Sequence, residues 1–163
     1  MSDLASAVRQ VISLGGGDFV GKTRLQKAFF LLEDRGIGFG LDFDYYHYGP
    51  YCEELSDAAR DAVALGLLTL DWKSNPTGGE YAVYSTGAVL SPESEIDRRR
   101  KTVINLVREN ESVVVELAAT ARYLKMNGFE SDFWEEVSVR KSKKYTDDRM
   151  RKACKLLERV DAI

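Results

Sequence analysis

The sequence predicts a mainly α fold with a small β-hairpin, which belongs to the α+β class. Apolar residues recur at helical spacing over most of the chain, and glycines separate the helical stretches. Strict alternation of apolar and polar residues is confined to the region 68–84. With 163 residues, the chain is long enough to bury one substantial core.

The first two predicted helices span residues 3–14 and 24–33. The first carries apolar residues at helical spacing and is followed by three consecutive glycines, which favour a helix end. In the second, Thr23 stands three positions before Gln26, and this spacing is typical of a capping box. A glycine-rich loop should follow.

The third predicted helix follows residues 43–48, which we expect to be extended or irregular. Pro50 is placed in its first turn, because proline is favoured there, and Gly66 is placed at its end. The positions expected to face inward are Leu55, Ala58, Ala59, Ala62 and Leu65.

A β-hairpin is predicted directly after this helix. Residues 68–72 alternate between apolar and polar, residues 74–79 contain a Pro/Gly turn, and residues 81–84 are rich in strand-forming residues. A hairpin that follows a glycine-terminated helix occupies the position of the wing in a winged helix. We therefore predict a winged-helix-like N-terminal core over residues 1–91.

The remainder, residues 92–163, is predicted to be a C-terminal helical bundle that packs on this core, so that the two parts form one compact unit. Ser91-Pro92-Glu93 is the expected start of its first helix, in which Ile96 faces inward. The apolar spacing predicts helices near 92–109, 112–127, 132–141 and 147–161.

Composition and charge restrict the class of protein. No apolar run approaches the roughly 20 residues that a membrane span needs. An acid precedes the first apolar residues, which is unlike a secretory signal, and the two cysteines form no disulfide framework. We expect a reduced, cytoplasmic protein that does not bind membranes.

The net charge of -3 is unevenly distributed. Residues 1–91 hold 7 basic and 12 acidic residues, a balance of -5, whereas residues 92–163 hold 16 and 14, a balance of +2. The net negative charge argues against general binding of nucleic acid. The asymmetry can indicate two surfaces that have different roles, but a balance of +2 is too small to establish them.

Three patterns resemble enzyme sites. Residues 16–23 match the phosphate-binding loop G-x-x-x-x-G-K-T, but the preceding segment has helical spacing, whereas such a loop needs a strand before it. Asp71 and Lys73 resemble the end of a nuclease site without its further acids. His47 and Cys52 resemble a nucleophile pair, but a single His among Tyr residues is far more often a hydrogen-bonded packing residue. We therefore predict no enzyme, no cofactor and no metal site.

The tyrosines around Gly49-Pro50 are the strongest candidates for a binding surface, because tyrosine offers a large contact area with a polar tip. We expect about half of them to pack against the first helices and at least one to be exposed. The predicted protein-binding residues combine this cluster with the acidic start of the third helix: Tyr46, Tyr48, Tyr51, Glu53, Glu54 and Asp57.

Binding to DNA is the alternative. The third helix would lie in the major groove, but its exposed acids, Glu53, Glu54, Asp57 and Asp61, outnumber the single Arg60, and phosphates repel such a helix. Any contact with nucleic acid should therefore use the basic clusters elsewhere: Arg98, Arg99, Arg100, Lys101, Arg140, Lys141, Lys143 and Lys144.

Several motifs together resemble a known group of proteins. They are TRLQKAFFLLE, FDYYHYGPYCEEL and a helix ending in LGLL, followed by VVELAATARYLKMNG and KKYTDDRMRKACKLLERV. This chain resembles the YwgA-type proteins and the broader SocA-like (Panacea) antitoxin domains, and the resemblance covers nearly its whole length. Its most specific parts are Leu25-Gln26-Lys27 and Tyr48-Gly49-Pro50.

The resemblance implies a winged-helix-like core with additional helices, found in bacterial, archaeal and mobile-element proteins. Members that are understood bind a protein, often a toxin, and the family offers no catalytic residues to transfer. We therefore expect a non-enzymatic, protein-binding regulatory module, antitoxin-like or associated with a mobile element. Its partner would be a toxin or a regulatory protein. The alternative is a winged-helix DNA-binding transcriptional regulator.

Overall fold

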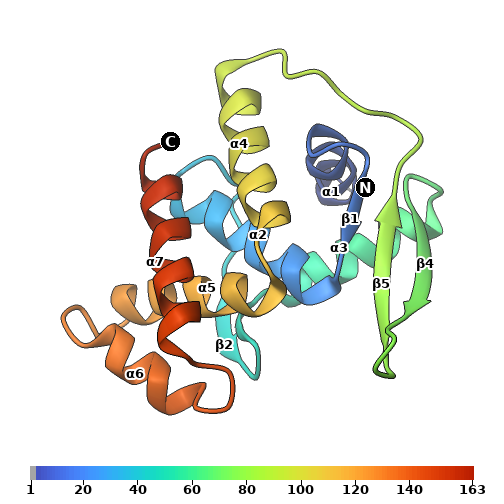
Figure 1. Ribbon diagram of the computed structural model, residues 1–163. Helices are drawn as coiled ribbons and strands as arrows, with labels where there is room; N and C mark the ends of the chain where they lie inside the picture. Colours follow the sequence, from blue (N-terminus) through green and yellow to red (C-terminus); the bar gives the residue numbers. More distant parts are fainter. Residues whose placement is uncertain (1–2) are drawn as a thin grey trace.

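The computed structural model describes residues 3–163. Its elements follow one another as α1 (Asp3–Leu14), β1 (Asp18–Val20), α2 (Lys22–Asp34), β2 (Asp44–Tyr46), β3 (Gly49–Tyr51), α3 (Glu53–Ala64), β4 (Thr69–Ser74), β5 (Glu80–Ser85), α4 (Glu95–Glu109), α5 (Ser112–Met126), α6 (Phe133–Arg140) and α7 (Asp147–Asp161). Figure 1 shows β4 and β5 on one side of the molecule and α6 and α7 on the other. The fold is of the α+β class, as the sequence predicts. None of the described helices is long and apolar enough to cross a lipid bilayer.

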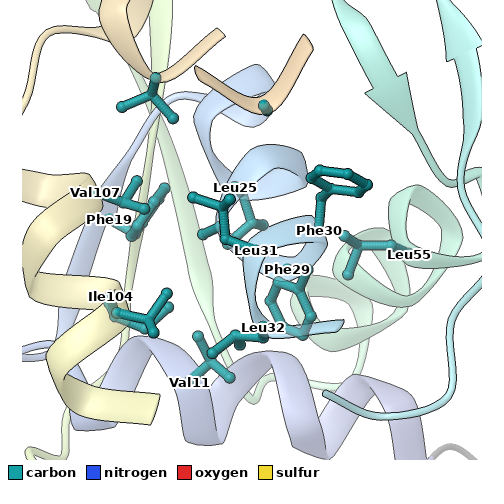
Figure 2. Close-up of a cluster of buried hydrophobic side chains, with 14 of the residues drawn as sticks. Val11, Phe19, Leu25, Phe29, Phe30, Leu31, Leu32, Leu55, Ile104 and Val107 are labelled. Atoms are coloured by element: carbon teal, nitrogen blue, oxygen red, sulfur yellow. The ribbon is translucent and has the colours of Figure 1, made fainter. Parts of the chain in front are cut away.

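Helix α2 lies at the centre of the fold. Every residue from 25 to 32 is buried, so this part of the helix is covered by protein on all sides instead of along one apolar stripe. It packs against α4, α5, β1 and β3. Figure 2 shows side chains from other elements around it: Val11, Phe19, Leu55, Ile104 and Val107. The core is thus built from both the N-terminal and the C-terminal parts of the chain.

The strands form two antiparallel sheets. The larger sheet has the order β1-β5-β4, and in it Tyr84 of β5 lies opposite Phe19 on one side and Leu70 on the other. Phe19 and Tyr84 are buried, so this face of the sheet covers the core. The hairpin of β4 and β5 confirms the predicted one. Strands β2 and β3 form a separate hairpin, in which Tyr45 is paired with Pro50.

Glycines end the helices where the sequence predicts. The amides of residues 15–17 donate hydrogen bonds back to the carbonyl groups of residues 11–13, and α1 ends at Leu14. Gly66 has φ of +77°, a left-handed conformation that favours glycine, and α3 ends just before it. The bounds predicted for α5, α6 and α7 agree with the observed ones to within one residue.

The predicted capping role of Thr23 is wrong. Helix α2 begins at Lys22 and Gly21 is its N-cap residue, without any capping hydrogen bond from a side chain. The reason is an unpredicted strand: β1 pairs with β5, and the Gly21 amide donates a hydrogen bond to the carbonyl oxygen of Ala82. This pairing fixes the backbone up to the start of the helix, and Thr23 falls inside the first turn.

The prediction for Pro50 is also wrong. This residue belongs to strand β3, and α3 begins at Glu53 with Cys52 as its N-cap residue. A proline suits a helix start and an edge strand equally well, because it lacks an amide proton in both. Gly49, with φ of +92°, turns the chain into the hairpin and decides between the two.

The start of α4 lies later than predicted. The hydroxyl of Ser94 accepts a hydrogen bond from the amide of Asp97, and the helix begins at Glu95 instead of at residue 92. The pattern at residues 91–93 is a plausible cap in sequence, but the structure uses the next serine. Ile96, expected to face inward, is 50% exposed, because it lies in the first turn, ahead of the buried part of the helix.

The inward position predicted for Leu65 is wrong as well, whereas Leu55 and the three alanines predicted with it are buried. Leu65 is 64% exposed, because α3 ends at Ala64 and the chain turns away at Gly66. Leu68, just before β4, takes a buried position instead.

Candidate functional site

The turn between β2 and β3 is held by its contact with α5. A Cβ atom on Gly49 would lie 2.5 Å from Oγ1 of Thr120, closer than real Cβ contacts come. With its positive φ as well, this position requires glycine for both space and conformation. The Tyr48-Gly49-Pro50 sequence therefore brings the hairpin main chain directly against α5.

The Leu25-Gln26-Lys27 motif holds the same hairpin from the other side. The side chain of Gln26 donates a hydrogen bond to the carbonyl oxygen of Cys52 at 2.9 Å and accepts one from its amide at 2.8 Å. Nζ of Lys27 donates to the carbonyl oxygen of Pro50 at 2.8 Å. Two polar side chains of a buried helix thus satisfy main-chain groups of β3 and the start of α3.

A buried carboxylate connects this hairpin to the C-terminal part of the chain. Glu116 of α5 forms ion pairs with Lys141 and Lys144, each with an N–O distance of 2.9 Å. Lys141 also donates a hydrogen bond to the carbonyl oxygen of His47, in the β2–β3 turn, at 2.8 Å. The segment after α6 therefore restrains the hairpin through its main chain.

Lys27 lies close to this cluster and has an unusual environment. It is 1% exposed, and its burial lowers the pKa of its ammonium group to about 8. Glu116 opposes this decrease, whereas Lys141 and Lys144 add to it. Three lysines therefore share a single buried carboxylate, and the region has more positive than negative charge.

A groove opens beside the hairpin. It encloses a volume of about 610 Å³ between the β2–β3 hairpin, α2, α3 and the inner face of the larger sheet. We call it the tyrosine groove and define it by the side chains that line it, chiefly Lys22, Leu25, Lys27, Tyr46, His47, Tyr48, Tyr51, Leu55, Ser56, Ala59, Arg60, Val63, Leu70 and Tyr84. Its size lies within the range of about 300–1,000 Å³ that is typical of ligand sites.

The tyrosine side chains form one wall of the groove. Tyr46 and Tyr51 meet edge to face, with 5.1 Å between their ring centroids, a favourable aromatic geometry. Tyr48 is 56% exposed, and the ammonium group of Lys144 lies 4.8 Å from the centre of its ring. Tyr45 instead packs against Tyr123 of α5. Tyr46 and Tyr48 are exposed, whereas Tyr45 packs against α5 and not against the first helices, which were the expected packing partners.

The six residues predicted for protein binding do not all lie together. Tyr46, Tyr48 and Tyr51 line the groove. Glu53, Glu54 and Asp57 are exposed on α3 but do not line it. On this helix, it is Ser56, Arg60 and Val63 that face the groove, so the acids occupy a different side of the helix.

The first basic cluster, residues 98–101, is largely engaged in contacts within the protein. Arg100 donates hydrogen bonds to the carbonyl oxygens of the loop 37–38, and its guanidinium group lies 4.1 Å from the ring centre of Phe39. Arg98 forms an exposed ion pair with Glu95 at 2.9 Å. These contacts leave Arg100 little freedom to reach a phosphate.

The second basic cluster, residues 140–144, is also largely engaged in contacts within the protein. Lys141 and Lys144 hold the buried Glu116, and Arg140 forms an ion pair with Glu136 at 2.7 Å. Lys143 is exposed and has no ion-pair partner within residues 3–163. The cluster therefore acts mainly inside the fold, and one lysine of it faces solvent freely.

Parts of two patterns that resemble enzyme sites are buried in the fold. Residues 18–20, inside the apparent phosphate-binding motif, form β1, and Phe19 is buried there. Cys52 is buried, which raises the pKa of its thiol. Within the described part of the chain, no three His, Cys, Asp or Glu side chains come together as metal ligands would.

The sequence predictions missed the polar residues beneath the groove. In the sequence, Gln26 and Lys27 belong to short motifs, and Glu116 and Thr120 belong to a predicted helix, without any indication that their side chains are buried. A charged residue in an otherwise apolar helical stripe was the available signal, since such residues are rarely buried without a partner. Their partners lie far away in sequence, which local spacing does not reveal.

Comparison with known proteins gives one informative relative. No protein-family model matches the chain. The chain is 26% identical over 152 residues to the uncharacterized protein YwgA of Bacillus subtilis (strain 168), and the match covers 90% of each protein. The similarity thus extends over nearly the entire fold, including the groove, and supports the YwgA-type part of the resemblance that the motifs indicate.

Proposed function

We propose that this protein is a non-enzymatic binding module that recognises a protein partner through the tyrosine groove. The single observation that carries the proposal is the groove itself: an apolar hollow of about 610 Å³ with aromatic side chains at its edge. Aromatic anchors beside an apolar pocket are typical of the energetically important centre of a protein interface.

A regulatory role, antitoxin-like or associated with a mobile element, is the biological setting that we propose. The sequence motifs resembling SocA-like (Panacea) domains support it. The order of α1, β1, α2, α3, β4 and β5, with β1 next to β5, supports the winged-helix-like description of the N-terminal part. The partner that we propose is a toxin or a regulatory protein.

The test is capture of a partner from the native host by the tagged protein, after nuclease treatment. Val63→Arg places a long charged side chain in the groove and should abolish capture of the partner. Leu65→Arg, near the end of the same helix, is the matched control, because Leu65 is exposed and does not line the groove. Both variants should first show the wild-type circular dichroism spectrum.

Three results are decisive. A protein captured in stoichiometric amount by the wild type and by Leu65→Arg, but not by Val63→Arg, supports the proposal. Equal capture by all three proteins contradicts the assignment of the groove. Recovery of nucleic acid alone, in the untreated sample, supports the DNA-binding alternative, which also requires binding that weakens steeply with salt concentration.

A further inference from the structure

The charges that line the tyrosine groove all have one sign. Lys22, Lys27 and Arg60 are the fully charged side chains among its lining residues, and none of these lining residues is Asp or Glu. Low-dielectric walls concentrate the field of such charges inside a cleft. An occupant with a negative group is therefore favoured over a neutral or positive one.

The buried Lys27 strengthens this preference for an occupant with a negative group. Its direct hydrogen-bond partner is the neutral carbonyl group of Pro50, and the nearby Glu116 is already paired with Lys141 and Lys144. Burial of an ammonium group without a carboxylate of its own costs free energy. A carboxylate in the groove would supply the missing opposite charge and raise the pKa of Lys27 from about 8.

The two cations at the edge of the groove can exchange their present contacts at low cost. Nζ of Lys22 lies 5.0 Å from the ring centre of Trp72. Arg60 is paired with Asp57 at 3.2 Å, and both side chains are more than half exposed. Exposed pairs of this kind contribute little to stability, so Arg60 can turn towards a ligand.

The acids of α3 determine where a negative partner can approach. Glu53, Glu54, Asp57 and Asp61 are exposed on the sides of the helix that do not line the groove. They repel an acidic segment from that surface, whereas the groove attracts it. Such complementarity fixes the orientation of a bound partner more than its affinity.

We infer that the segment of the partner that occupies the tyrosine groove is apolar and carries a carboxylate, which Lys22 and Arg60 contact at the edge and Lys27 attracts from beneath. This inference rests on the proposed function, since it specifies the chemistry of the proposed partner. The apolar part of the segment fills the space beside Tyr48 and Val63.

The experiment selects short linear peptides from a random phage-displayed library on the immobilised protein. Selected sequences should combine aromatic or aliphatic residues with one Asp or Glu. A synthetic peptide with a selected sequence should bind roughly tenfold more tightly than the same peptide with its Asp or Glu replaced by Asn or Gln. Its affinity should decrease as the pH rises above about 8, because Lys27 then loses its proton.

Matched variants locate the effect. Lys22→Glu should weaken binding of the acidic peptide but not of its amide form. Lys73→Glu changes the net charge equally on β4, outside the groove, and should leave both affinities unchanged. Val63→Arg should prevent binding of both peptides.

The outcomes separate this inference from the proposed function. If the selected peptides bind the wild type but not Val63→Arg, and the peptides show no preference for an acidic residue, the inference is wrong. The proposed function is then unaffected. Failure to select any groove-dependent peptide overturns the inference as well. After such a failure, two dyes test for a small ligand in place of a peptide. If 1-anilinonaphthalene-8-sulfonate binds in the groove and its uncharged analogue N-phenyl-1-naphthylamine does not, the occupant is a small apolar anion. Partner capture that is unaffected by Val63→Arg contradicts the proposed function itself.

Discussion

Gly49 and Thr120 lie so close together that no larger residue than glycine fits at position 49. A Cβ atom there would be 2.5 Å from Oγ1 of Thr120, and this hydroxyl is itself buried without a hydrogen-bond partner within residues 3–163. The contact joins the β2–β3 hairpin to α5. The position of the tyrosine wall of the groove therefore depends on a residue in the C-terminal part of the chain.

Replacement of Gly49 by alanine should destabilise the protein by about 3 kcal/mol, because strain of the left-handed backbone adds to a steric clash. Gly66→Ala is the matched control. Gly66 also has a positive φ, but nothing lies within 4 Å of its added Cβ atom, so the loss should be only about 1 kcal/mol. Urea unfolding measures both. Equal losses would show that the clash with Thr120 is unimportant.

Gln26→Ala should reduce the free energy of unfolding by about 3 kcal/mol. The substitution removes both hydrogen bonds to Cys52 and leaves its buried amide unpaired, whereas its carbonyl oxygen keeps the hydrogen bond from the amide of Ser56. Gln10→Ala, which removes one partly buried hydrogen bond to Asp97, should cost about 1 kcal/mol. Chemical denaturation of the two variants tests this difference, and a loss for Gln26→Ala no larger than that of the control contradicts it.

Glu116→Gln should be among the most destabilising charge-neutralising substitutions. It keeps the size of the side chain but leaves Lys141 and Lys144 without their buried counter-charge, at a cost of about 3–5 kcal/mol. Glu136→Gln removes the more accessible pair with Arg140 and should cost about 0.5 kcal/mol. Thermal unfolding at pH 7 provides the comparison. Similar melting temperatures for the two variants would refute the structural role of Glu116.

The stability contribution of Lys27 should depend on pH in a defined direction. Its pKa is about 8 in the folded protein and 10.5 when it is unfolded, so below pH 8 the ammonium group is charged in both states and its burial is unfavourable. Between about pH 8 and 10.5 the folded protein has lost this proton and the unfolded chain still binds it. The group's contribution to stability therefore increases with pH in this window, by on the order of 3 kcal/mol.

Lys27→Met removes this dependence. Denaturation of wild type and variant at several pH values should show the wild type gaining stability relative to the variant as the pH rises from about 8 to 10.5. The charged groups near Lys27 are Glu116, Lys141 and Lys144, and both proteins contain them. A constant difference across this range would show that the pKa of Lys27 is not lowered.

The sequence predicts the helices well because their ends carry local signals. The glycines after α1 and α3 stop α1 at the expected residue and α3 close to it, and apolar spacing alone locates α5, α6 and α7. The β4–β5 hairpin is equally local, since its alternation and its turn lie in one segment. Such features need no knowledge of distant contacts.

The errors arise where distant contacts decide the outcome. Strand β1 has three residues, too few for a period, and only its pairing with β5 makes it a strand. Pro50 fits two local structures, and the strand is favoured by Gly49, which packs against Thr120 of α5, and by the hydrogen bond of Lys27 to the Pro50 carbonyl oxygen. The tyrosines of the groove stand out in the sequence because they cluster around Gly49-Pro50, whereas Glu116 does not, because its partners are 25 and 28 residues further along the chain.

The burial of residues 25–32 of α2 has a consequence for synthesis of the protein. This helix leaves the ribosome before α4 and α5, which pack against it and begin only at residue 95. Until they are made, the nascent chain exposes apolar side chains such as Phe30 and Leu31, which are buried in the finished fold. Exposed apolar surface of this kind promotes aggregation and attracts chaperones. Cotranslational folding of α2 is therefore completed only when the later helices α4 and α5 have been synthesised and pack against it.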